Sequence, residues 1–351
     1  MQRYIGIDVH TASCTLAVMG PSGRRITERV VDTSEVALRQ AVKDIAGDKW
    51  VVFEEGKHSD WLYEVLEPVV KELIVVQPRG SWGTKNDSKD AWDLAQGMRT
   101  GTLERVVYKA PRRFAELRAA VRAQCLVTQD VTRCKLRLRA QFIARGVKLQ
   151  GRCLYTEANR EALLEQLPTP QRCLTQVLYE ELDGLQEVLQ DTEEWLHRVA
   201  HKTDAVRRLS TIPGIAEIRA AQIVATVVSP HRFRTRQQFW AYCGLGIVTR
   251  SSSDWVRGSA GWQRREVQQT RGLNRNHNRL MKNVFVGAAL ATTRRMRPNP
   301  LQTQYEGLLK KGTKPNLARL TIARRIATIA LTLWKREEEY RPDKVTTNAA
   351  A

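Results

Sequence analysis

Several features that would place a chain in a membrane or outside the cell are missing from this sequence of 351 residues. Its longest apolar stretches, such as residues 326–334, fall well short of the roughly 18 residues that a membrane-spanning helix needs. We recognise no signal peptide. The six cysteines form no C-x-x-C pair, a pattern that favours reduced thiols over a disulfide framework. We therefore expect a cytoplasmic protein.

Acidic residues are scarce relative to basic ones. The chain has 37 Asp and Glu residues against 57 Lys and Arg residues, which gives a formal net charge of +20 and a pI near 10.1. The natural counter-charge for such a surface is a polyphosphate, so we expect a nucleic-acid partner. The sequence has no G-x-x-x-x-G-K-S/T loop that would bind a nucleoside triphosphate.

Residues 1–108 alternate between strand and helix signals. Three apolar strands in hairpin order, followed by alternating helices and strands, predict an RNase-H-like, or RuvC-like, mixed α/β sheet. Actin-like sugar kinases share this order, although such a kinase would need a glycine-rich phosphate loop. After the strands, which extend to Val31, the expected elements are a helix over 34–46, a strand over 50–55, a helix over 61–70, a strand over 72–76 and a helix over 88–98.

Residues 109–204 are expected to form an all-α, coiled-coil region. No strong helix breaker occurs from about 111 to 147, and a second helical stretch, from about 171 to 200, is acidic. An antiparallel pair would leave the basic face of the first helix to bind nucleic acid or a second subunit. The alternative is an ordinary solvated face. The basic residues that we single out are Arg133, Lys135, Arg137 and Arg139.

Residues 205–335 are expected to form a third, mainly helical domain, followed by a disordered tail over 336–351. In this domain Ile212-Pro213-Gly214-Ile215 joins two helical stretches, as in a helix-hairpin-helix-like element. Its turn would expose backbone N–H groups that can hold phosphate whatever the base sequence. A plain interhelical turn is the alternative.

Four carboxylates stand where the predicted sheet could present them together. Asp8 lies in an apolar strand, where an ionised side chain is costly to bury without a cation or a donor. Glu55 ends the strand over 50–55, with Glu54 as a near-equal neighbour. Asp87 and Asp90 fall three residues apart, on one face of a helix start.

Such a set supplies hard oxygen ligands for Mg²⁺ or Mn²⁺, and two ions together can stabilise the attacking and leaving oxygens of a phosphodiester exchange. Each member also has an ordinary structural explanation. Asp87 would serve as a helix N-cap, Asp90 as a first-turn acid that the helix dipole favours, and Glu55 as an exposed acid. The combination is therefore more informative than any one residue.

The carboxylate motifs resemble those of the DEDD transposases, the large bacterial insertion-sequence family now described as bridge-RNA-guided recombinases. The resemblance rests on Gly6-Ile7-Asp8-Val9-His10, Phe53-Glu54-Glu55-Gly56 and residues 85–91, and it extends over about residues 3–335. Family members often show an acid, one spacer and then Thr-Gly or Ser-Gly at the second motif, so Glu54 and Glu55 both stay open. The resemblance implies that Mg²⁺ is bound in a RuvC-like fold by Asp8, Glu55, Asp87 and Asp90.

The resemblance also points to a catalytic serine after Cys243-Gly244-Leu245-Gly246. Counting from Gly244, the family's serine falls on Ser252, with Ser251 and Ser253 as alternatives. A serine hydroxyl is a weak nucleophile until its proton is removed or the phosphorus becomes more electrophilic, and arginines can neutralise phosphate oxygens. The stretch 258–265 has the glycine, tryptophan and arginine suited to contact with bases and backbone. The arginines expected to contact nucleic acid are Arg250, Arg257, Arg264, Arg265, Arg271 and Arg275.

The resemblance thus implies a transposase that exchanges donor and target DNA strands through a serine–DNA intermediate in the bacterial cytoplasm. It also implies a structured guide RNA and a homo-oligomer, either a dimer or a tetramer. Two other interpretations stay open. A metal-dependent junction nuclease would hydrolyse DNA with water and would not need Ser252. A non-catalytic nucleic-acid-binding protein would not need Asp8 either.

Overall fold

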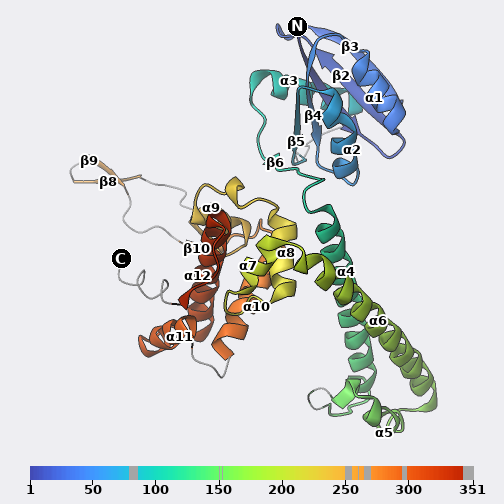
Figure 1. Cartoon of the computed structure of the whole chain (residues 1–351), viewed down its shortest axis with the longest axis vertical. Coiled ribbons are helices and arrows are strands. Elements are labelled where there is room, and N and C mark those ends of the chain that lie inside the picture. The colour runs from blue at the N-terminus through green and yellow to red at the C-terminus, as the bar shows by residue number, and fades with distance from the viewer. Residues whose placement is uncertain are drawn as a thin grey trace. The chain divides into compact units, whose positions relative to one another are not determined.

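The computed structural model describes residues 1–78, 86–149, 151, 153–249, 255–259, 261–264, 270–294 and 299–342. The chain divides into two compact units, Met1–Arg113 and Phe114–Ala351, and each is described by itself (Figure 1). Within the described ranges, no helix combines the length and the apolar character that crossing a bilayer requires.

Unit 1 is built on a six-stranded mixed sheet in the order β3-β2-β1-β4-β5-β6. Strand β1 is antiparallel to β2 and parallel to β4, and β6 closes the other edge antiparallel to β5. The mixed α/β fold and the order of its elements agree with the RNase-H-like sheet expected from the sequence. The elements are β1 (Gln2–Val9), β2 (Ser13–Met19), β3 (Arg25–Asp32), α1 (Glu35–Lys43), β4 (Asp48–Glu54), α2 (Ser59–Leu66), η1 (Glu67–Val69), β5 (Glu72–Val76), α3 (Asp87–Thr100) and β6 (Val106–Val107).

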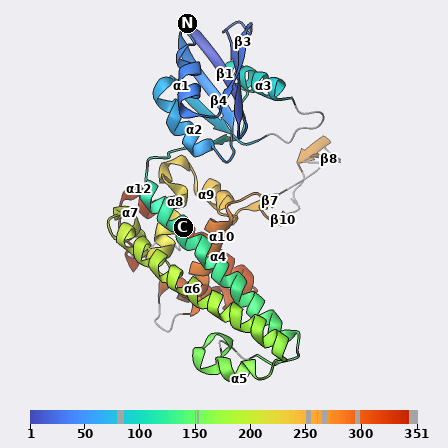
Figure 2. The ribbon, with the colours of Figure 1, turned by 90° about the vertical axis from the view of Figure 1, so that its right-hand side faces the viewer.

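Helices cover the sheet on both faces, with α1 and α2 on one side and α3 on the other (Figure 2). Successive side chains of a strand point to opposite faces. Ile7 of β1 and Phe53 of β4 are fully buried on the α1 and α2 side, with Leu38 and Leu62. Val52 of β4 is buried on the other side, against α3. The alternation therefore fixes the side of the sheet on which each polar residue of β1 and β4 lies.

Gly6 brings α3 directly onto β1. A Cβ atom at this position would lie 2.0 Å from the carbonyl oxygen of Ala91 and 2.6 Å from the backbone nitrogen of Ala95. Only glycine leaves room for that approach. Because the contact falls one turn into α3, the first residues of the helix lie near the carboxyl end of β1.

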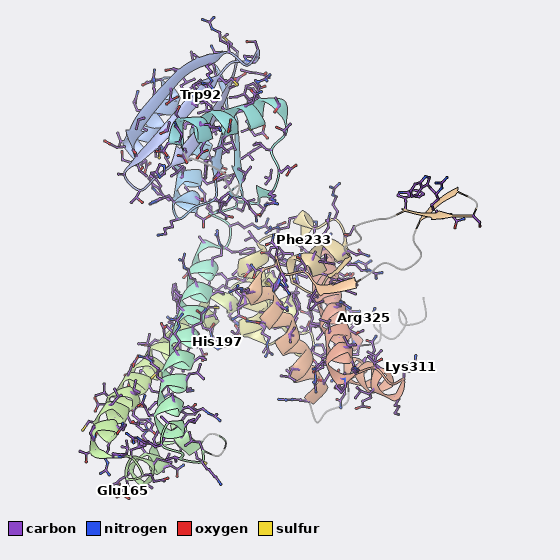
Figure 3. The ribbon with its side chains drawn as sticks, turned by 180° about the vertical axis from the view of Figure 1, so that it is seen from behind. Trp92, Glu165, His197, Phe233, Lys311 and Arg325 are labelled. Atoms are coloured by element: carbon purple, nitrogen blue, oxygen red, sulfur yellow. The ribbon has the colours of Figure 1, made fainter. Side chains whose placement is uncertain are left out.

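A second contact fastens α3 to the edge of the sheet. Glu28 of β3 accepts hydrogen bonds from Trp92 Nε1 at 2.6 Å and from Ser88 Oγ at 2.7 Å (Trp92 is labelled in Figure 3). The same two bonds hold the pKa of the Glu28 carboxyl below its usual value. The guanidinium of Arg25 stacks 4.7 Å above the Trp92 ring. Helix α3 is thus held both at its middle and near its start.

Unit 2 is mainly helical. Its helices α4 and α6 lie side by side in an antiparallel pair (Figure 2), and most of its other helices share a large apolar core. The elements are α4 (Ala115–Ile143), η2 (Cys153–Tyr155), η3 (Glu157–Asn159), α5 (Arg160–Leu164), α6 (Thr169–His201), α7 (Asp204–Ser210), α8 (Glu217–Val227), η4 (Pro230–Arg232), α9 (Arg236–Tyr242), β7 (Ile247–Thr249), β8 (Trp255–Gly258), β9 (Gly261–Arg264), β10 (Thr270–Leu273), α10 (Arg279–Arg294), α11 (Pro300–Lys310) and α12 (Pro315–Arg336).

The α4–α6 pair has apolar contacts at both of its ends. Leu138 and Phe142, near the end of α4, pack with Leu182 of α6, whereas Leu117, at the start of α4, packs with Leu196 of α6. This is the antiparallel helical pair expected from the sequence. Its supercoil geometry stays a prediction.

The turn between α7 and α8 packs against α10. Gly214 has a φ of +83°, and a Cβ atom there would lie 2.4 Å from the carbonyl oxygen of Ala288. Thr292 Oγ1 donates to the Pro213 carbonyl at 3.0 Å. The turn is therefore built into the core, and a helix-hairpin-helix role for it stays a prediction.

Two short ladders interrupt the helices after α9. Strand β7 pairs with β10 through Thr249 and Thr270 and through Ile247 and Leu273, so residues 250–269 leave and rejoin the unit at one place. Strands β8 and β9 pair with each other inside this segment. Pairing with β7 holds residues 270–273 extended, and the next helix, α10, begins at Arg279.

The chain stays attached to unit 2 beyond α12. Tyr340 packs against the main core, and its backbone N–H donates to Thr211 Oγ1 at 2.9 Å. Ordered structure therefore extends past residue 335, where we had expected the tail to begin. Residues 343–351 lie outside the described ranges.

Candidate metal centre

Asp8 lies on the face of the sheet that α3 covers. It follows Gly6 by two residues on β1, and strand alternation sends both positions to that face. Its partner across the antiparallel pair is Thr15. The Asp8 side chain is only 21% exposed, so its carboxylate is partly desolvated but can still be reached by a ligand.

Asp87 reaches the same place from the first position of α3. Asn86 caps the helix, because its side chain accepts hydrogen bonds from the backbone of Ser88 and Lys89. Asp87 is therefore not the N-cap, and its carboxylate can face the sheet.

A histidine lies between these two carboxylates. His10 Nε2 is 3.0 Å from Asp8 Oδ2 and 3.3 Å from Asp87 Oδ1. One ligand atom from each of Asp8, His10 and Asp87 lies within 4.8 Å of the others. The structure thus brings together two of the four predicted carboxylates, with an imidazole that the sequence analysis did not assign to the site.

The electrostatics of Asp8 reflect this crowding. Burial is the main cause that raises the pKa of its carboxyl, and the charges of Asp87 and Asp90 raise it further. His10 acts in the opposite direction, through its charge and its hydrogen bond. The carboxylate of Asp90 therefore lies close enough to affect the pKa of Asp8. A cation is the species that would relieve such like-charge crowding.

Glu55 is engaged elsewhere. Its Oε1 accepts a hydrogen bond from Lys109 Nζ at 3.0 Å, and the same ammonium group is 2.9 Å from Asp60 Oδ1, at the start of α2. The Lys109 side chain is 11% exposed, whereas the side chains of Glu55 and Asp60 are 39% and 55% exposed, so a largely buried ammonium group pairs with two partly exposed carboxylates. The structure does not bring Glu55 into the group that Asp8 and Asp87 form.

Glu54 shares the face of Asp8. Strand alternation places it on the same side of β4 as Val52, which packs against α3. The parallel register pairs Ile7 with Phe53, so Glu54 stands beside Asp8 one residue further along. The strand geometry therefore favours Glu54 as the acid from β4.

His10 was missed because its proximity to Asp87 is a tertiary contact. It follows Asp8 by two residues, which is the one local signal in the sequence. Asp87 comes from a helix much later in the chain, and only the packing of α3 on Gly6 brings it near.

The predicted serine, Ser252, lies outside the described residues, as do Ser251 and Ser253. Arg250 and Arg265 also lie outside them, whereas Arg264 and Arg271 fall on β9 and β10. Arg257 and Arg275 are exposed. The structure does describe the paired strands β7 and β10, which flank the segment that contains Ser252.

The basic residues of α4 already have local partners. Arg133 pairs with Asp130 at 2.7 Å and Arg137 pairs with Glu181 of α6 at 2.5 Å. Lys135 Nζ lies 5.3 Å from the centre of the Tyr155 ring, and Arg139 is exposed. Exposed ion pairs typically contribute only about 0–1 kcal/mol, so these side chains can exchange their partners for phosphates.

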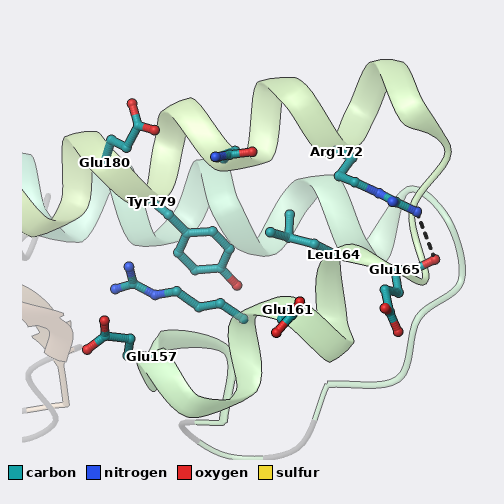
Figure 4. A pocket seen from close by; sticks show the side chains of 9 residues that line it. Glu157, Glu161, Leu164, Glu165, Arg172, Tyr179 and Glu180 are labelled. Atoms are coloured by element: carbon teal, nitrogen blue, oxygen red, sulfur yellow. Dashed lines mark hydrogen bonds between the residues drawn. The ribbon is translucent and has the colours of Figure 1, made fainter.

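A separate polar cavity of about 490 Å³ lies near α5 and the start of α6 (Figure 4). Arg160 crosses it, stacks 4.6 Å from the Tyr179 ring and makes a bidentate pair with Asp183 at 2.5 Å. The cavity contains none of the predicted site residues. Its lining is Glu157, Arg160, Glu161, Leu164, Glu165, Arg172, Gln176, Tyr179 and Glu180.

Two family models match the chain. A DEDD transposase model covers residues 5–143, and the model of the transposase IS116/IS110/IS902 family covers residues 206–306. The first match contains the candidate metal centre, and the second contains the segment with the predicted serine.

Curated relatives are similar to parts of the chain. The transposase for insertion sequence element IS1111A of Coxiella burnetii is 27% identical over 165 residues, 47% of this chain and 42% of the relative. The putative transposase y4pF/y4sB of Sinorhizobium fredii is 25% identical over 267 residues, 73% of this chain and 64% of the relative. A probable family 20 transposase of Pseudomonas aeruginosa is 26% identical over 178 residues, 50% of this chain and 49% of the relative.

The chain thus spans between 42% and 64% of the length of these relatives. The two family matches nevertheless fall on both units and follow the order expected from the sequence motifs. The chain belongs to the IS110-type family of DEDD transposases.

Proposed function

We propose that the protein is a DNA transposase that cuts and rejoins DNA strands, with a divalent-cation centre in unit 1 and Ser252 as the nucleophile. The observation that carries the proposal is the convergence of Asp8, His10 and Asp87 within 4.8 Å at the carboxyl end of the central strand β1. This is where an RNase-H-like fold would present a metal to a phosphodiester.

The residues present suit a hard divalent cation such as Mg²⁺ or Mn²⁺. Carboxylate oxygens are the preferred ligands of both ions, and an imidazole nitrogen is compatible with the second. We assign Asp8, Asp87 and Asp90 as ligands, with Glu54 rather than Glu55 as the acid from β4. A cation bound there would neutralise charge that develops on the phosphate oxygens.

The assignment of Glu54 rests on the strand geometry. Glu55 pairs with the largely buried ammonium group of Lys109, and this pair would have to break before Glu55 could bind a cation. Breaking the pair would leave Asp60 as a partner of the Lys109 ammonium group. Glu54 already stands on the α3 face beside Asp8.

The proposed strand transfer conserves the number of bonds. Ser252 Oγ forms a bond to phosphorus, the bond from phosphorus to the leaving oxygen breaks, and the serine proton ends on that oxygen, which becomes a free hydroxyl. Attack on the phosphoserine by the hydroxyl of another strand reverses the step, joins the strands and restores the serine. No nucleoside triphosphate is consumed, which agrees with the lack of a triphosphate-binding loop in the sequence.

The proposal includes a structured guide RNA, donor and target DNA, and a homo-oligomer. The net charge of +20 and the exposed basic side chains of α4 support a large polyanionic partner. We expect Arg133, Arg137 and Arg139 to contact RNA phosphates. Replacing all three with alanine should reduce the amount of co-purified RNA and the salt dependence of its binding.

The test is an adduct assay with the full-length protein. We would incubate it with co-purified RNA, labelled donor and target DNA and Mg²⁺, then use denaturing electrophoresis and peptide mapping. We expect a DNA adduct on the peptide with residues 251–253. It should disappear in Ser252→Ala and persist in the matched variants Ser251→Ala and Ser253→Ala.

Other results would overturn parts of the proposal. Free cut ends at the wild-type rate in Ser252→Ala, without any adduct, would indicate a junction nuclease that uses water. Full function in Asp8→Ala would indicate a nucleic-acid-binding protein without catalysis.

A further inference from the structure

Strands β8 and β9 form a two-stranded ribbon with two chemically different faces. The register pairs Arg257 with Trp262 and Trp255 with Arg264. Residues directly opposite each other in an antiparallel pair share a face, and so do residues two apart on one strand. Trp255, Arg257 and Trp262 therefore lie on the same face.

The other face carries Gln263. A Cβ atom at Gly258 would lie 3.1 Å from Gln263 Oε1, so this side chain covers the glycine on that side. The ribbon thus separates an aromatic and cationic face from a neutral polar one, and Gln263 offers a control position on the same short ribbon.

Both indole rings are in contact with solvent. The exposed fraction is 57% for Trp255 and 69% for Trp262. Arg257 and Gln263 are exposed as well. Side chains at such exposure contribute little to the core, and tryptophan and arginine are enriched at the residues that carry most of the energy of binding interfaces.

The spacing of the two tryptophans suits a nucleobase. Diagonal neighbours across an antiparallel pair lie about 7–8 Å apart. Bases along a strand are separated by about 3.4 Å, so the two positions lie about two base steps apart along a stacked strand. The Arg257 guanidinium, on the same face, provides the charge that a phosphate needs.

We propose that the face formed by Trp255, Arg257 and Trp262 stacks on unpaired bases of the DNA strand that the protein cuts. Aromatic rings stack on every base, so the contact is independent of sequence. A protein partner would gain little from a cationic face on a chain of net charge +20. The choice of DNA over RNA rests on the proposed function, because Ser252 belongs to the same segment between β7 and β10.

This surface would stabilise unpaired bases during strand exchange. A strand that leaves one duplex and joins another has unpaired bases in between, and these bases lose stacking energy when they separate from their neighbours. Tryptophans close in sequence to the nucleophile would replace part of that stacking. The ribbon would then stabilise the open strand without selecting a sequence.

The experiment measures binding alone and so does not depend on the serine chemistry. In a Ser252→Ala background, fluorescence anisotropy would give the affinity of the full-length protein for a short labelled oligothymidine. The same length of abasic DNA, which has phosphates and no bases, would be measured beside it. The variants are Trp262→Ala, Trp262→Phe, Trp255→Ala and the control Gln263→Ala.

We expect Trp262→Ala and Trp255→Ala each to weaken oligothymidine binding by roughly 5- to 150-fold, the range for loss of one stacked base. Trp262→Phe should restore most of the affinity, and Gln263→Ala should leave it unchanged. Abasic DNA should bind all variants equally.

Three results would overturn the proposal. The first is unchanged oligothymidine affinity in both tryptophan variants, and the second is an equal loss for abasic DNA, which would indicate a distorted ribbon. The third is a larger loss for an oligouridine RNA than for the DNA, which would assign the face to RNA. A missing serine adduct would overturn the proposed nucleophile and leave the binding result standing.

Discussion

Lys109 Nζ lies 3.0 Å from Glu55 Oε1, so Glu55 pairs with a lysine and not with the carboxylates of the candidate metal centre. Two adjacent acids at the end of β4 thus have different surroundings. Glu55 fixes the end of the strand to the segment after β6 and to α2, through Lys109 and Asp60, whereas Glu54 faces α3.

The roles that we propose for the two acids predict different phenotypes. Glu54→Gln should reduce strand transfer by about 100-fold or more, because a metal ligand contributes several kcal/mol to the transition state. Glu55→Gln should keep the activity and lower the free energy of unfolding by about 1 kcal/mol or less, since Glu55 is partly exposed and Asp60 remains a partner of Lys109. Strand-transfer rates and denaturant unfolding would be measured for both.

The affinity for Mn²⁺, measured by electron paramagnetic resonance, tests the assignment independently of activity. It should weaken in Glu54→Gln and stay unchanged in Glu55→Gln. The reverse pattern would identify Glu55 as the metal ligand and contradict the assignment of Glu54 from strand alternation.

The raised pKa of Asp8 predicts how stability depends on pH. A carboxyl whose pKa is higher in the folded state than in the unfolded state stabilises the fold below its unfolded pKa, near 4, and this contribution is lost as the pH rises through the folded value. In metal-free buffer at neutral pH, Asp8→Asn should therefore raise Tm by a few degrees. The gain should vanish in acid.

His10→Ala gives the opposite result. Because His10 lowers the pKa of Asp8, its loss should raise that pKa further and reduce stability at neutral pH. Thermal unfolding from pH 3 to pH 8 would measure both variants. An Asp8→Asn protein less stable than wild type at pH 7 without metal would show that the carboxylate is favourable as it stands.

Gly6 predicts a link between packing and the metal centre. Gly6→Ala would place a methyl group 2.0 Å from the Ala91 carbonyl oxygen, so α3 has to move away from β1. Overpacking of this kind costs about 1–3 kcal/mol or more, and it should also weaken Mn²⁺ binding because Asp87 moves with the helix. Denaturant unfolding and metal titration would follow the two effects.

A matched control is Gly184→Ala, on α6. A Cβ atom there would meet no neighbour within 4 Å, so the change should leave stability unchanged or raise it slightly. Equal behaviour of the two alanine variants would mean that α3 does not depend on close contact with Gly6.

Much of unit 1 could be predicted because its signals are local. The apolar runs that became β1, β2 and β4 and the Ser34 cap of α1 are all visible in short windows of sequence. The sequence could not show which of the two acids at the end of β4 lies on the α3 face, since Glu54 and Glu55 differ only in the side of the sheet that they face. That side is set by pairing with β1.

The contacts missed from the sequence join distant segments. His10 meets Asp87 through the packing of α3, and residues 270–273 are extended because of their pairing with β7. Neither residue type nor spacing shows either contact. Likewise, the basic stretch of α4 could be recognised, but not the partners that Arg137 finds on α6.

Because β7 and β10 pair with each other, the segment between them can be replaced without changing the fold around it. The pairing holds the two ends of this segment together, so the packing of the helical core does not depend on the length of the segment. Doubling a loop adds only about 0.6 kcal/mol of closure entropy. Evolution or an engineer can therefore lengthen, shorten or replace residues 250–269 while the surrounding helices keep their places.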